Sequence, residues 1–397
     1  MITVLQNVTL IDGTGQAPIK NATILIEEGR IQAAGRAEEI QLPEESTSID
    51  LEGKTVIPGL IDCHIHMDLH GFANTYDENL VEDKLRALRA AHEMENTLRR
   101  GITTVRNLGS VNHIDFAVKD ALAEGYCKGP RVLTSGKIIS MTASGNDYFK
   151  GLYREADGPD EVRKAAREQL KAGADVLKIM ATGAVMNPGG APGVPQLNPD
   201  EIRAVVEEGA KLGIRVAAHA HGTKGIKNSI LAGVATIEHC TFMTDEIIDL
   251  LIQHDVYMVP TYVVDHLMLK AGAEGGIPPF MLQKIESIQA QFRVMFKRAI
   301  DAGVKVAFGT DAGTNYNYHG NNALELALLV EDGFMTPIQA IRSGTLISAQ
   351  ALGLENEIGT IETGKIADLV VVNGSLEKGL RPLVDEVEMV FQSGQLV

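Results

Sequence analysis

The stretch DEVRKAAREQLKAGADVLKIMA, residues 160–181, indicates the fold because a helical pattern leads directly into a buried strand. The helical part opens on Asp160 and closes on Gly173, residue types that are common at the two ends of helices. The run ADVLKIMA that follows is short and apolar, which is typical of a strand buried in a parallel sheet. A helix that leads into such a strand favours an α/β fold.

This alternation recurs along the middle of the chain. Two further stretches, NPDEIRAVVEEGAKLG and TDEIIDLLIQHD, have helical patterns with start signals. Eight runs have the character of strands, in the order GLIDCHIH, ITTVRNLG, RVLTSGKIIS, ADVLKIMA, RVAAHAH, ATIEHC, VYMVPTY and KVAFGTDAG. Eight strands that alternate with helices predict a (β/α)8 TIM-type barrel, and an open doubly wound parallel sheet is the structural alternative.

The two ends of the chain resemble each other and differ from the middle. Residues 1–57 and 358–397 contain short β-rich runs broken by Gly, Asn and Asp. Neither end is long enough to bury a large core of its own. We therefore predict a small β-sandwich built from both termini, beside a barrel of residues 58–357.

Composition limits the partners and the location of the protein. With 52 acidic and 36 basic residues the formal net charge is -16, which disfavours nucleic acid as a partner. Three scattered cysteines favour a reducing compartment. Neither a signal peptide nor an apolar run of about 18 residues is found, so we expect a cytoplasmic protein that does not cross a membrane.

Side chains that can bind a metal collect at the carboxyl ends of the predicted strands, where a βα barrel builds its active site. They are His64 and His66 on the first strand, Lys178 on the fourth, His219 and His221 on the fifth, His239 on the sixth and Asp311 on the eighth. Residues two apart on a strand share a face, so both histidines of the first strand point into the barrel mouth. One such pair is often only polar surface, but the coincidence on five strands predicts a metal site.

Lys178 raises a separate question, because an ammonium group in a buried strand needs a partner. An ordinary explanation is a lysine near the strand end that reaches solvent. A Schiff-base lysine of a barrel aldolase is another explanation, although it leaves the histidines and Asp311 without a role.

Five motifs together resemble the amidohydrolase superfamily of metal-dependent barrel hydrolases, namely PGLIDCHIH, ADVLKIMATGA, VAAHAHG, TIEHC and GTDAG. The resemblance covers essentially the whole chain, including GTIETGKIADLVVV in the predicted sandwich. The stretches ADGPDEVRKAAREQLKAGADVLKIMATG and HGNNALELALLVEDGFMTPIQAI are most similar to one subgroup. It contains dipeptidases for Xaa-Pro or Xaa-Arg dipeptides and related amidases, often labelled imidazolonepropionase-like.

The resemblance implies a binuclear centre of two divalent ions, and the nitrogen and oxygen ligands suit zinc, although manganese or cobalt could also be loaded. Six residues would hold the ions: His64, His66 and Asp311 the more buried one, His219 and His239 the other, and Lys178, carboxylated by carbon dioxide, both. A buried lysine has a lowered pKa, so its neutral amine can react with carbon dioxide. We also expect a homo-oligomer.

The expected reaction is hydrolysis of an amide C–N bond by a metal-bridging hydroxide. Asp311 would take up the proton and deliver it to the leaving nitrogen. His221 would polarise or orient the substrate carbonyl, although a supporting or surface role explains this histidine equally well.

The substrate is the least determined part, and a small-molecule dipeptide or N-acyl amino acid is expected. Close members of the subgroup carry Gly-Gly-His-Gly after Met-Thr, whereas this chain reads MTASGNDYF, so a histidine that faces the substrate is absent. A lactam, an aromatic amide or an imidazolonepropionase-like cyclic amide is therefore the alternative. Residues that could bind the substrate, or equally cap helices or support loops, are Arg106, Tyr153, Arg154, Tyr262 and His319.

Two other classes of protein are alternatives. A mononuclear cyclic amidase or deaminase would not need Lys178, and a non-catalytic barrel would typically have lost ligands. The segment 265–301, DHLMLKAGAEGGIPPFMLQKIESIQAQFRVMFKRAID, is rich in Met and Phe. It predicts an amphipathic helix packed on the barrel or on a neighbouring subunit, with a lid or an apolar substrate wall as the alternative.

Overall fold

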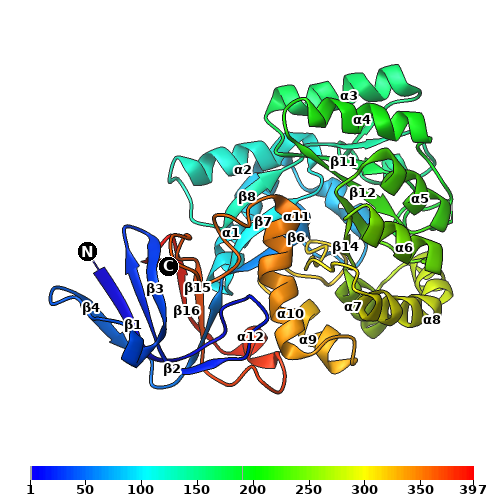
Figure 1. The fold of residues 1–397 in the computed structure, drawn as a ribbon. Coiled ribbons are helices and arrows are strands. Elements are labelled where there is room, and N and C mark those ends of the chain that lie inside the picture. The colour runs from blue at the N-terminus through cyan, green and yellow to red at the C-terminus, as the bar shows by residue number, and fades with distance from the viewer. Residues whose placement is uncertain (1, 190) are drawn as a thin grey trace.

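The computed structural model describes residues 2–189 and 191–397. Met1, the first residue of the predicted segment 1–57, and Gly190 lie outside the described residues. Strands from both ends of the chain lie side by side at one end of the molecule, next to a larger body of strands and helices (Figure 1).

The two chain ends share one eight-stranded sheet. Its strands are β1 (Ile2–Leu10), β2 (Ile19–Glu27), β3 (Arg30–Arg36), β4 (Thr47–Asp50), β5 (Thr55–Pro58), β15 (Leu369–Val372), β16 (Val387–Gln392) and β17 (Gln395–Leu396). The order β17-β16-β15-β5-β1-β2-β3 places C-terminal β15 against N-terminal β5, and β4 pairs with β1. The two ends of the chain therefore form one sheet, as expected. The sandwich form and the boundaries 1–57 and 358–397 stay predictions.

The pleat of two central strands connects this sheet to the rest of the molecule. Val56 of β5 and Val371 of β15 belong to the small core of the terminal sheet. Their neighbours Ile57 and Val370 belong instead to the large core of the α/β body. Because successive side chains of a strand point to opposite faces, β5 and β15 are buried on both sides and join the two cores.

The remaining strands form parallel sheets, which confirms the α/β class. One sheet contains β6 (Leu60–Ile65), β7 (Ile102–Asn107) and β8 (Arg131–Thr134). The other contains β9 (Ile138–Ser140), β10 (Tyr153–Glu155), β11 (Val176–Met180), β12 (Arg215–Ala220), β13 (Thr236–His239) and β14 (Tyr257–Val259). The pairings within both are parallel, in the orders β6-β7-β8 and β10-β9-β11-β12-β13-β14.

Helices connect these strands, and Figure 1 shows α3 to α6 outside β11 and β12. The helices are α1 (Asp83–Arg99), α2 (Ile114–Ala123), α3 (Pro159–Ala172), α4 (Pro199–Ala210), α5 (Thr223–Ala232), α6 (Asp245–Gln253), α7 (Tyr262–Ala271), α8 (Pro279–Ala302), α9 (Leu324–Glu331), α10 (Pro337–Arg342), α11 (Ser348–Leu352) and α12 (Arg381–Asp385). The three helices expected from sequence are α3, α4 and α6. Helix α4 begins with a capping box of Asn198 and Glu201, and α3 ends at Gly173 in the left-handed conformation.

Two of the eight predicted strands differ in the structure. The third is divided into β8 and β9, because Gly136 between them has a φ of 67° and its N–H donates to Asp115. The eighth, residues 305–313, is no regular strand and pairs only through bridges of Val306 with Met258 and Ala312 with Ile65. A left-handed φ of 58° at Asp311 interrupts its ladder.

The segment 305–312 nevertheless connects the two parallel sheets. The N–H of Ala307 donates to the carbonyl of Met258 on β14 at 2.9 Å. On the other side, the N–H of Cys63 on β6 donates to the carbonyl of Phe308 at 2.8 Å. Backbone hydrogen bonds therefore continue from the last strand of one parallel sheet to the first strand of the other.

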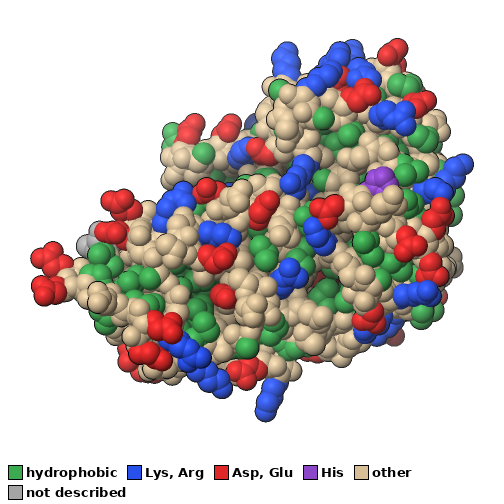
Figure 2. All heavy atoms as spheres, in the orientation of Figure 1, with side chains coloured by type: hydrophobic (Ala, Val, Ile, Leu, Met, Phe, Trp, Pro, Cys, Tyr) green, Lys and Arg blue, Asp and Glu red, His purple; other side chains and the backbone are tan. Residues whose placement is uncertain are grey.

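The Met-rich and Phe-rich segment forms two helices, α7 and α8, instead of one. The long helix α8 buries an apolar stripe at helical spacing that includes Met281, Ile285, Ile288, Phe292 and Phe296. Among the described residues, no helix is both long and apolar enough to cross a membrane. On the face of the molecule shown in Figure 2, acidic and basic side chains are interspersed, so this face offers no continuous basic surface.

Candidate metal centre

The carboxyl ends of the parallel strands bring the six predicted metal ligands to one cavity. Strands β6, β11, β12 and β13, with the segment 305–312, supply them, and a βα arrangement collects side chains at this end. The cavity is lined by His64, His66, Lys178, His219, His239 and Asp311, together with His221.

Two groups of donor atoms within this cavity are close enough to hold an ion. The ligand atoms of His64, His239 and Asp311 lie within 4.8 Å of one another, and so do those of His219, His221 and His239. Oδ1 of Asp311 is 3.3 Å from Nε2 of His64 and 3.2 Å from Nε2 of His66. His239 belongs to both groups and therefore lies between them.

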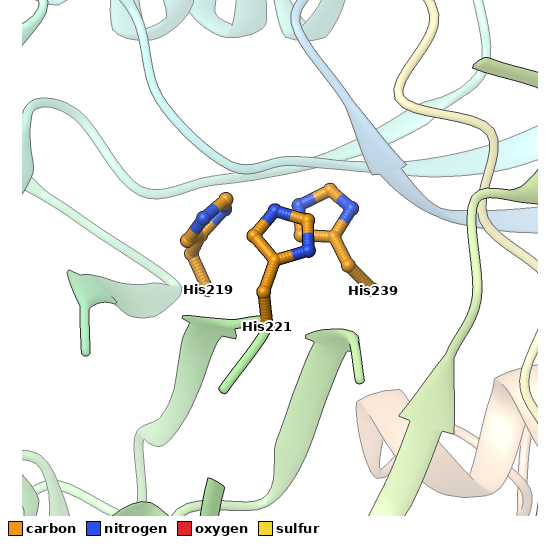
Figure 3. Close-up of side chains that lie close together, drawn as sticks. All are labelled: His219, His221 and His239. Atoms are coloured by element: carbon orange, nitrogen blue, oxygen red, sulfur yellow. The ribbon is translucent and has the colours of Figure 1, made fainter. Parts of the chain in front are cut away.

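Three imidazole rings from neighbouring strands are gathered in the second group, as Figure 3 shows. The ring centre of His219 is 4.6 Å from that of His221 and 4.6 Å from that of His239. The rings of His221 and His239 are stacked at 4.8 Å. The structure thus places His221 as close to the predicted ligands as they are to each other.

Backbone strain occurs at this end of the strands. His239, Thr261 and Asp311 have left-handed φ values of 69°, 50° and 58°. Such values are unfavourable for residues with a Cβ and persist where the surrounding structure holds them. Two of these three residues are predicted ligands, so the strain aims side chains into the cavity.

Hydrogen-bond partners behind the rings orient most of the histidines, as is usual for metal ligands. The Nδ1 atoms face away from the cavity, towards Gly109 O from His66 (3.1 Å), Thr241 Oγ1 from His221 (2.7 Å) and Thr261 Oγ1 from His239 (2.7 Å). Each of these rings therefore presents Nε2 to the cavity. His219 is turned the other way, because its Nε2 lies 3.4 Å from the carbonyl of Gly183.

His64 is supported by a buried acid that the sequence analysis did not single out. Nδ1 of His64 lies 2.9 Å from Oε2 of Glu238, and Oε1 of Glu238 lies 3.0 Å from Nη2 of Arg106. All three side chains are buried. The only sequence signal was an acidic residue inside the apolar strand ATIEHC, next to His239.

Four histidines of the cavity, His64, His219, His221 and His239, are neutral at neutral pH. Burial lowers the pKa of His64 and of His221 to about 4. It holds the pKa of His219 and His239 well below the ordinary value. A neutral imidazole has the free electron pair that a metal ion requires.

Lys178 and Asp311 complete the electrostatics of the site. Nζ of Lys178 is buried and has no hydrogen-bond partner among the described residues, and burial lowers the pKa of this amine to about 8. Burial alone would raise the pKa of Asp311, but His64 and His66 outweigh it, so this pKa falls to about 2. Neutral imidazoles, an ionised carboxylate and an unpaired amine fit a centre for divalent metal ions.

The predicted substrate-binding residues divide into two sets. Tyr153 and Tyr262 line the cavity. The hydroxyl of Tyr153 is 3.4 Å from Oδ1 of Asn187. The hydroxyl of Tyr262 is 2.5 Å from Oδ2 of Asp332, so this tyrosine offers the cavity its ring rather than its hydroxyl.

The other three candidates, Arg106, Arg154 and His319, are not among the residues that line the cavity, and their contact with substrate stays a prediction. Arg106 is buried against Glu238, where the negative charge holds it. Arg154 is bound to Glu168 at 2.6 Å. Nε2 of His319 lies 3.2 Å from the carbonyls of His66 and Leu69, so it supports the loop that follows β6.

Apolar side chains form most of the cavity wall beyond the polar centre. They come from β9 and the segment after it, from β11 and the loop after it, and from both α7 and α8, and they include Ile138, Phe149, Leu152, Met180, Val185, Val264, Met268 and Phe292. The segment 265–301 thus forms a packed amphipathic helix and also contributes to the apolar wall of the cavity, the two alternatives that its sequence offers. Residues 143–146, the segment in which the expected histidine is absent, are not among the residues that line the cavity.

Parallel strands with imidazoles and a carboxylate at their carboxyl ends are typical of metal-dependent hydrolases. Residues 55–397 match the model of the amidohydrolase family, and the chain belongs to this family. It is a hydrolase that acts on carbon–nitrogen bonds, and the resemblance found in the sequence is confirmed.

Named relatives of this chain act on different compounds. Ochratoxinase of Aspergillus niger is 31% identical over 399 residues, which cover 94% of this chain and 81% of that protein. An imidazolonepropionase of Salinispora tropica is 25% identical over 415 residues and covers 96% of this chain and 94% of its own. The crystal structure of a Xaa-Pro dipeptidase with bound methionine in its active site is 34% identical, with a TM-score of 0.92 over 100% of both chains.

Proposed function

We propose that this chain is a binuclear, zinc-dependent amidohydrolase that cleaves the amide C–N bond of a dipeptide or an N-acyl amino acid. The observation that carries this proposal is Lys178, whose buried Nζ has no hydrogen-bond partner among the described residues and which lines a cavity with five histidines. A solvent-reaching lysine is inconsistent with this burial. A Schiff-base lysine would leave the histidine cluster without a role.

The scaffold in this proposal is a closed (β/α)8 barrel with a small terminal β-sandwich. Two sets of backbone contacts support closure. Residues 305–312 bond to both β14 and β6. Between β8 and the start of β11, the N–H of Asp175 donates to the carbonyl of Thr134 at 2.8 Å.

Six residues would hold the ions, with Lys178 as a bridging ligand after carboxylation. In that modification Nζ forms a bond to the carbon of carbon dioxide and loses a proton, which leaves a carbamate anion. The pKa of about 8 leaves part of the amine neutral at neutral pH, as the reaction requires. The ligands are those predicted from sequence, namely His64, His66, Asp311, His219, His239 and Lys178. Bound divalent ions supply an activated water and polarise the amide carbonyl.

Asp311 moves the proton in this proposal. Its lowered pKa of about 2 keeps it ionised, so its carboxylate can accept the proton of the attacking water. The same carboxylate then delivers the proton to the amide nitrogen as the C–N bond breaks. His221 would orient the carbonyl: its Nδ1 lies 2.7 Å from the hydroxyl oxygen of Thr241, and in the tautomer in which Nδ1 accepts from this hydroxyl, Nε2–H donates to the substrate oxygen.

The names of the relatives support an amide as substrate, since they include an ochratoxinase and a Xaa-Pro dipeptidase. Hydrolysis of a cyclic amide is the second candidate. It is favoured by the absence of a histidine in the segment MTASGNDYF and by the similarity to an imidazolonepropionase.

The first test is a measurement of metal content and hydrolysis on protein purified with zinc and bicarbonate. We expect two metal ions per chain and hydrolysis of at least one member of a panel of dipeptides, N-acyl amino acids and lactams. In a Lys178→Ala variant the activity should fall to that of metal-free protein. Lys164→Ala, which removes an exposed lysine of α3, is the control and should retain the activity.

About one ion per chain, or activity that is indifferent to Lys178, would contradict the bridged centre and favour a mononuclear amidase. Cleavage of lactams alone would favour the second candidate.

A further inference from the structure

One acidic side chain of the cavity wall takes no part in the chemistry described above. Asp265, on α7, lines the cavity together with Val264 and Met268 of the same helix. Its side chain is half-buried at the cavity wall, and no hydrogen bond or ion pair with another described residue satisfies its carboxylate. A carboxylate in apolar surroundings is costly without a donor or a counter-ion.

Helix α7 fixes the position of Asp265 relative to the metal centre. Thr261, at the start of the helix, has its Oγ1 2.7 Å from Nδ1 of His239. Asp265 follows four residues later, about one helical turn or 5.4 Å along the axis. Glu325 accepts hydrogen bonds from the first two backbone N–H groups of α7 at 3.0 and 2.6 Å, which anchors the helix.

The cavity offers Asp265 no cation of its own. Among the described lining residues there is no arginine, and the one lysine is Lys178, which belongs to the metal centre. Burial, with a smaller effect of Asp311, raises the pKa of Asp265 to about 7, and a positive charge beside it would favour the ionised form. A ligand that brings a cation into the cavity would satisfy this group.

We infer that Asp265 binds a cationic amine of the substrate, so that the enzyme selects amides with a free ammonium group over their deaminated or N-acyl counterparts. In a dipeptide the ammonium is carried by the atom next to the scissile carbonyl carbon. It therefore enters the part of the cavity between the centre at His239 and the wall at Asp265. This inference rests on the proposed amide hydrolysis and chooses, within it, the dipeptide over the N-acyl amino acid.

A binding measurement tests the recognition separately from catalysis. The probes are L-leucinol and 4-methyl-1-pentanol, which differ only in the amino group and contain no amide bond. We expect the zinc-loaded protein to bind L-leucinol roughly ten- to hundredfold more tightly, the range for a hydrogen bond to a charged group. In Asp265→Asn, which keeps the shape and removes the charge, this ratio should fall to about one, where the probes bind alike.

Asp249→Asn is the matched control, because it removes an exposed acid of α6 and should leave the ratio at the wild-type value. Equal binding of the two probes to wild type, or no binding of L-leucinol, would overturn the inference. So would a preference that persists in Asp265→Asn, since the amine would then be bound by the metal centre.

Hydrolysis of a matched pair extends the test to the reaction. Leucyl-glycine is a dipeptide, and 4-methylpentanoyl-glycine is the same molecule without the amino group. We expect kcat/KM to favour leucyl-glycine in wild type and this preference to collapse in Asp265→Asn. Equal hydrolysis by wild type would overturn the role of Asp265 and leave amide hydrolysis intact. Selective binding of L-leucinol without hydrolysis of any amide would contradict the proposed function and leave the recognition intact.

Discussion

Single residues of the cavity owe their chemistry to the groups that lie behind them. His64 and Glu238 illustrate this, because the ring nitrogen that faces away from Asp311 lies 2.9 Å from the buried acid. Arg106 balances the same acid at 3.0 Å. This chain of charges fixes which nitrogen of His64 faces the cavity. The sequence predicted His64 from its place in HxH, whereas Glu238 needed knowledge of what packs beside it.

Replacement of Glu238 by Gln tests this support. The change leaves buried Arg106 without its counter-charge, so we expect a loss of about 3 kcal/mol in the free energy of unfolding. Metal affinity should weaken roughly 10- to 100-fold, as is typical when the partner of a ligand is removed. Urea unfolding and metal retention against a competing chelator measure the two effects.

The control for this variant is Glu246→Gln, which removes an exposed acid that pairs with Lys227 on the surface. A surface pair contributes about 0–1 kcal/mol, so little change is expected. If Glu238→Gln matched this control in both stability and metal retention, the supporting role of Glu238 would be wrong.

At the scale of elements, the outer helices are held together by a cluster of charges on α3 and α4. The carboxylate of Glu208 on α4 is buried and accepts from Arg167 at 3.0 Å, Arg163 at 2.8 Å and Lys211 at 2.6 Å. The hydrogen bond from Arg167, supported by the other two cations, outweighs burial and lowers the pKa of Glu208 to about 2. The sequence predicted both helices, but this contact between them depends on how they pack.

The lowered pKa predicts a dependence of stability on acid. Because the folded pKa lies below the ordinary value of 4.5, ionised Glu208 stabilises the protein above about pH 4.5. This contribution is lost as the pH falls from 4.5 through 2. We expect Glu208→Gln to lower the free energy of unfolding by about 2 kcal/mol at pH 7, and the difference from wild type to shrink towards pH 2.

Chemical denaturation at several pH values measures this effect. Glu207→Gln is the control, since its carboxylate is half exposed and pairs only with Arg163. It should cost less than about 1 kcal/mol at any pH. A difference between Glu208→Gln and wild type that stayed constant from pH 7 to pH 2 would speak against this assignment.

For the whole molecule, the proposed metal centre would connect parts of the chain that are distant in sequence. Its candidate ligands lie on or directly after β6, β11, β12 and β13 and in the segment 305–312, which lies between the two parallel sheets. Ions that bind only the folded chain stabilise it by about 2.7 kcal/mol at a free concentration of one hundred times Kd.

Metal removal should therefore lower the melting temperature. We expect dialysis against a chelator to decrease the Tm by several degrees and added zinc to restore it. Calorimetry with metal analysis of the same samples measures both quantities. Loss of the ions without any change in Tm would contradict a centre shared by these strands.

The sequence by itself determined the α/β class, the order of the strands and the six candidate ligands. Apolar runs, helix caps and the period of two along a strand are local, so neighbouring residues are enough to specify them. The prediction of a regular eighth strand was wrong, because the left-handed φ at Asp311 is imposed by its surroundings.

Only the tertiary structure decided which distant residues meet. It paired β5 with β15, turned Arg106 from an expected substrate contact into the partner of Glu238, and placed Asp265 on the cavity wall. The two pairings join residues that are more than one hundred and more than three hundred positions apart, and their energies depend on burial and on the charges opposite. Such quantities are properties of the packed chain, and a local pattern of residues does not contain them.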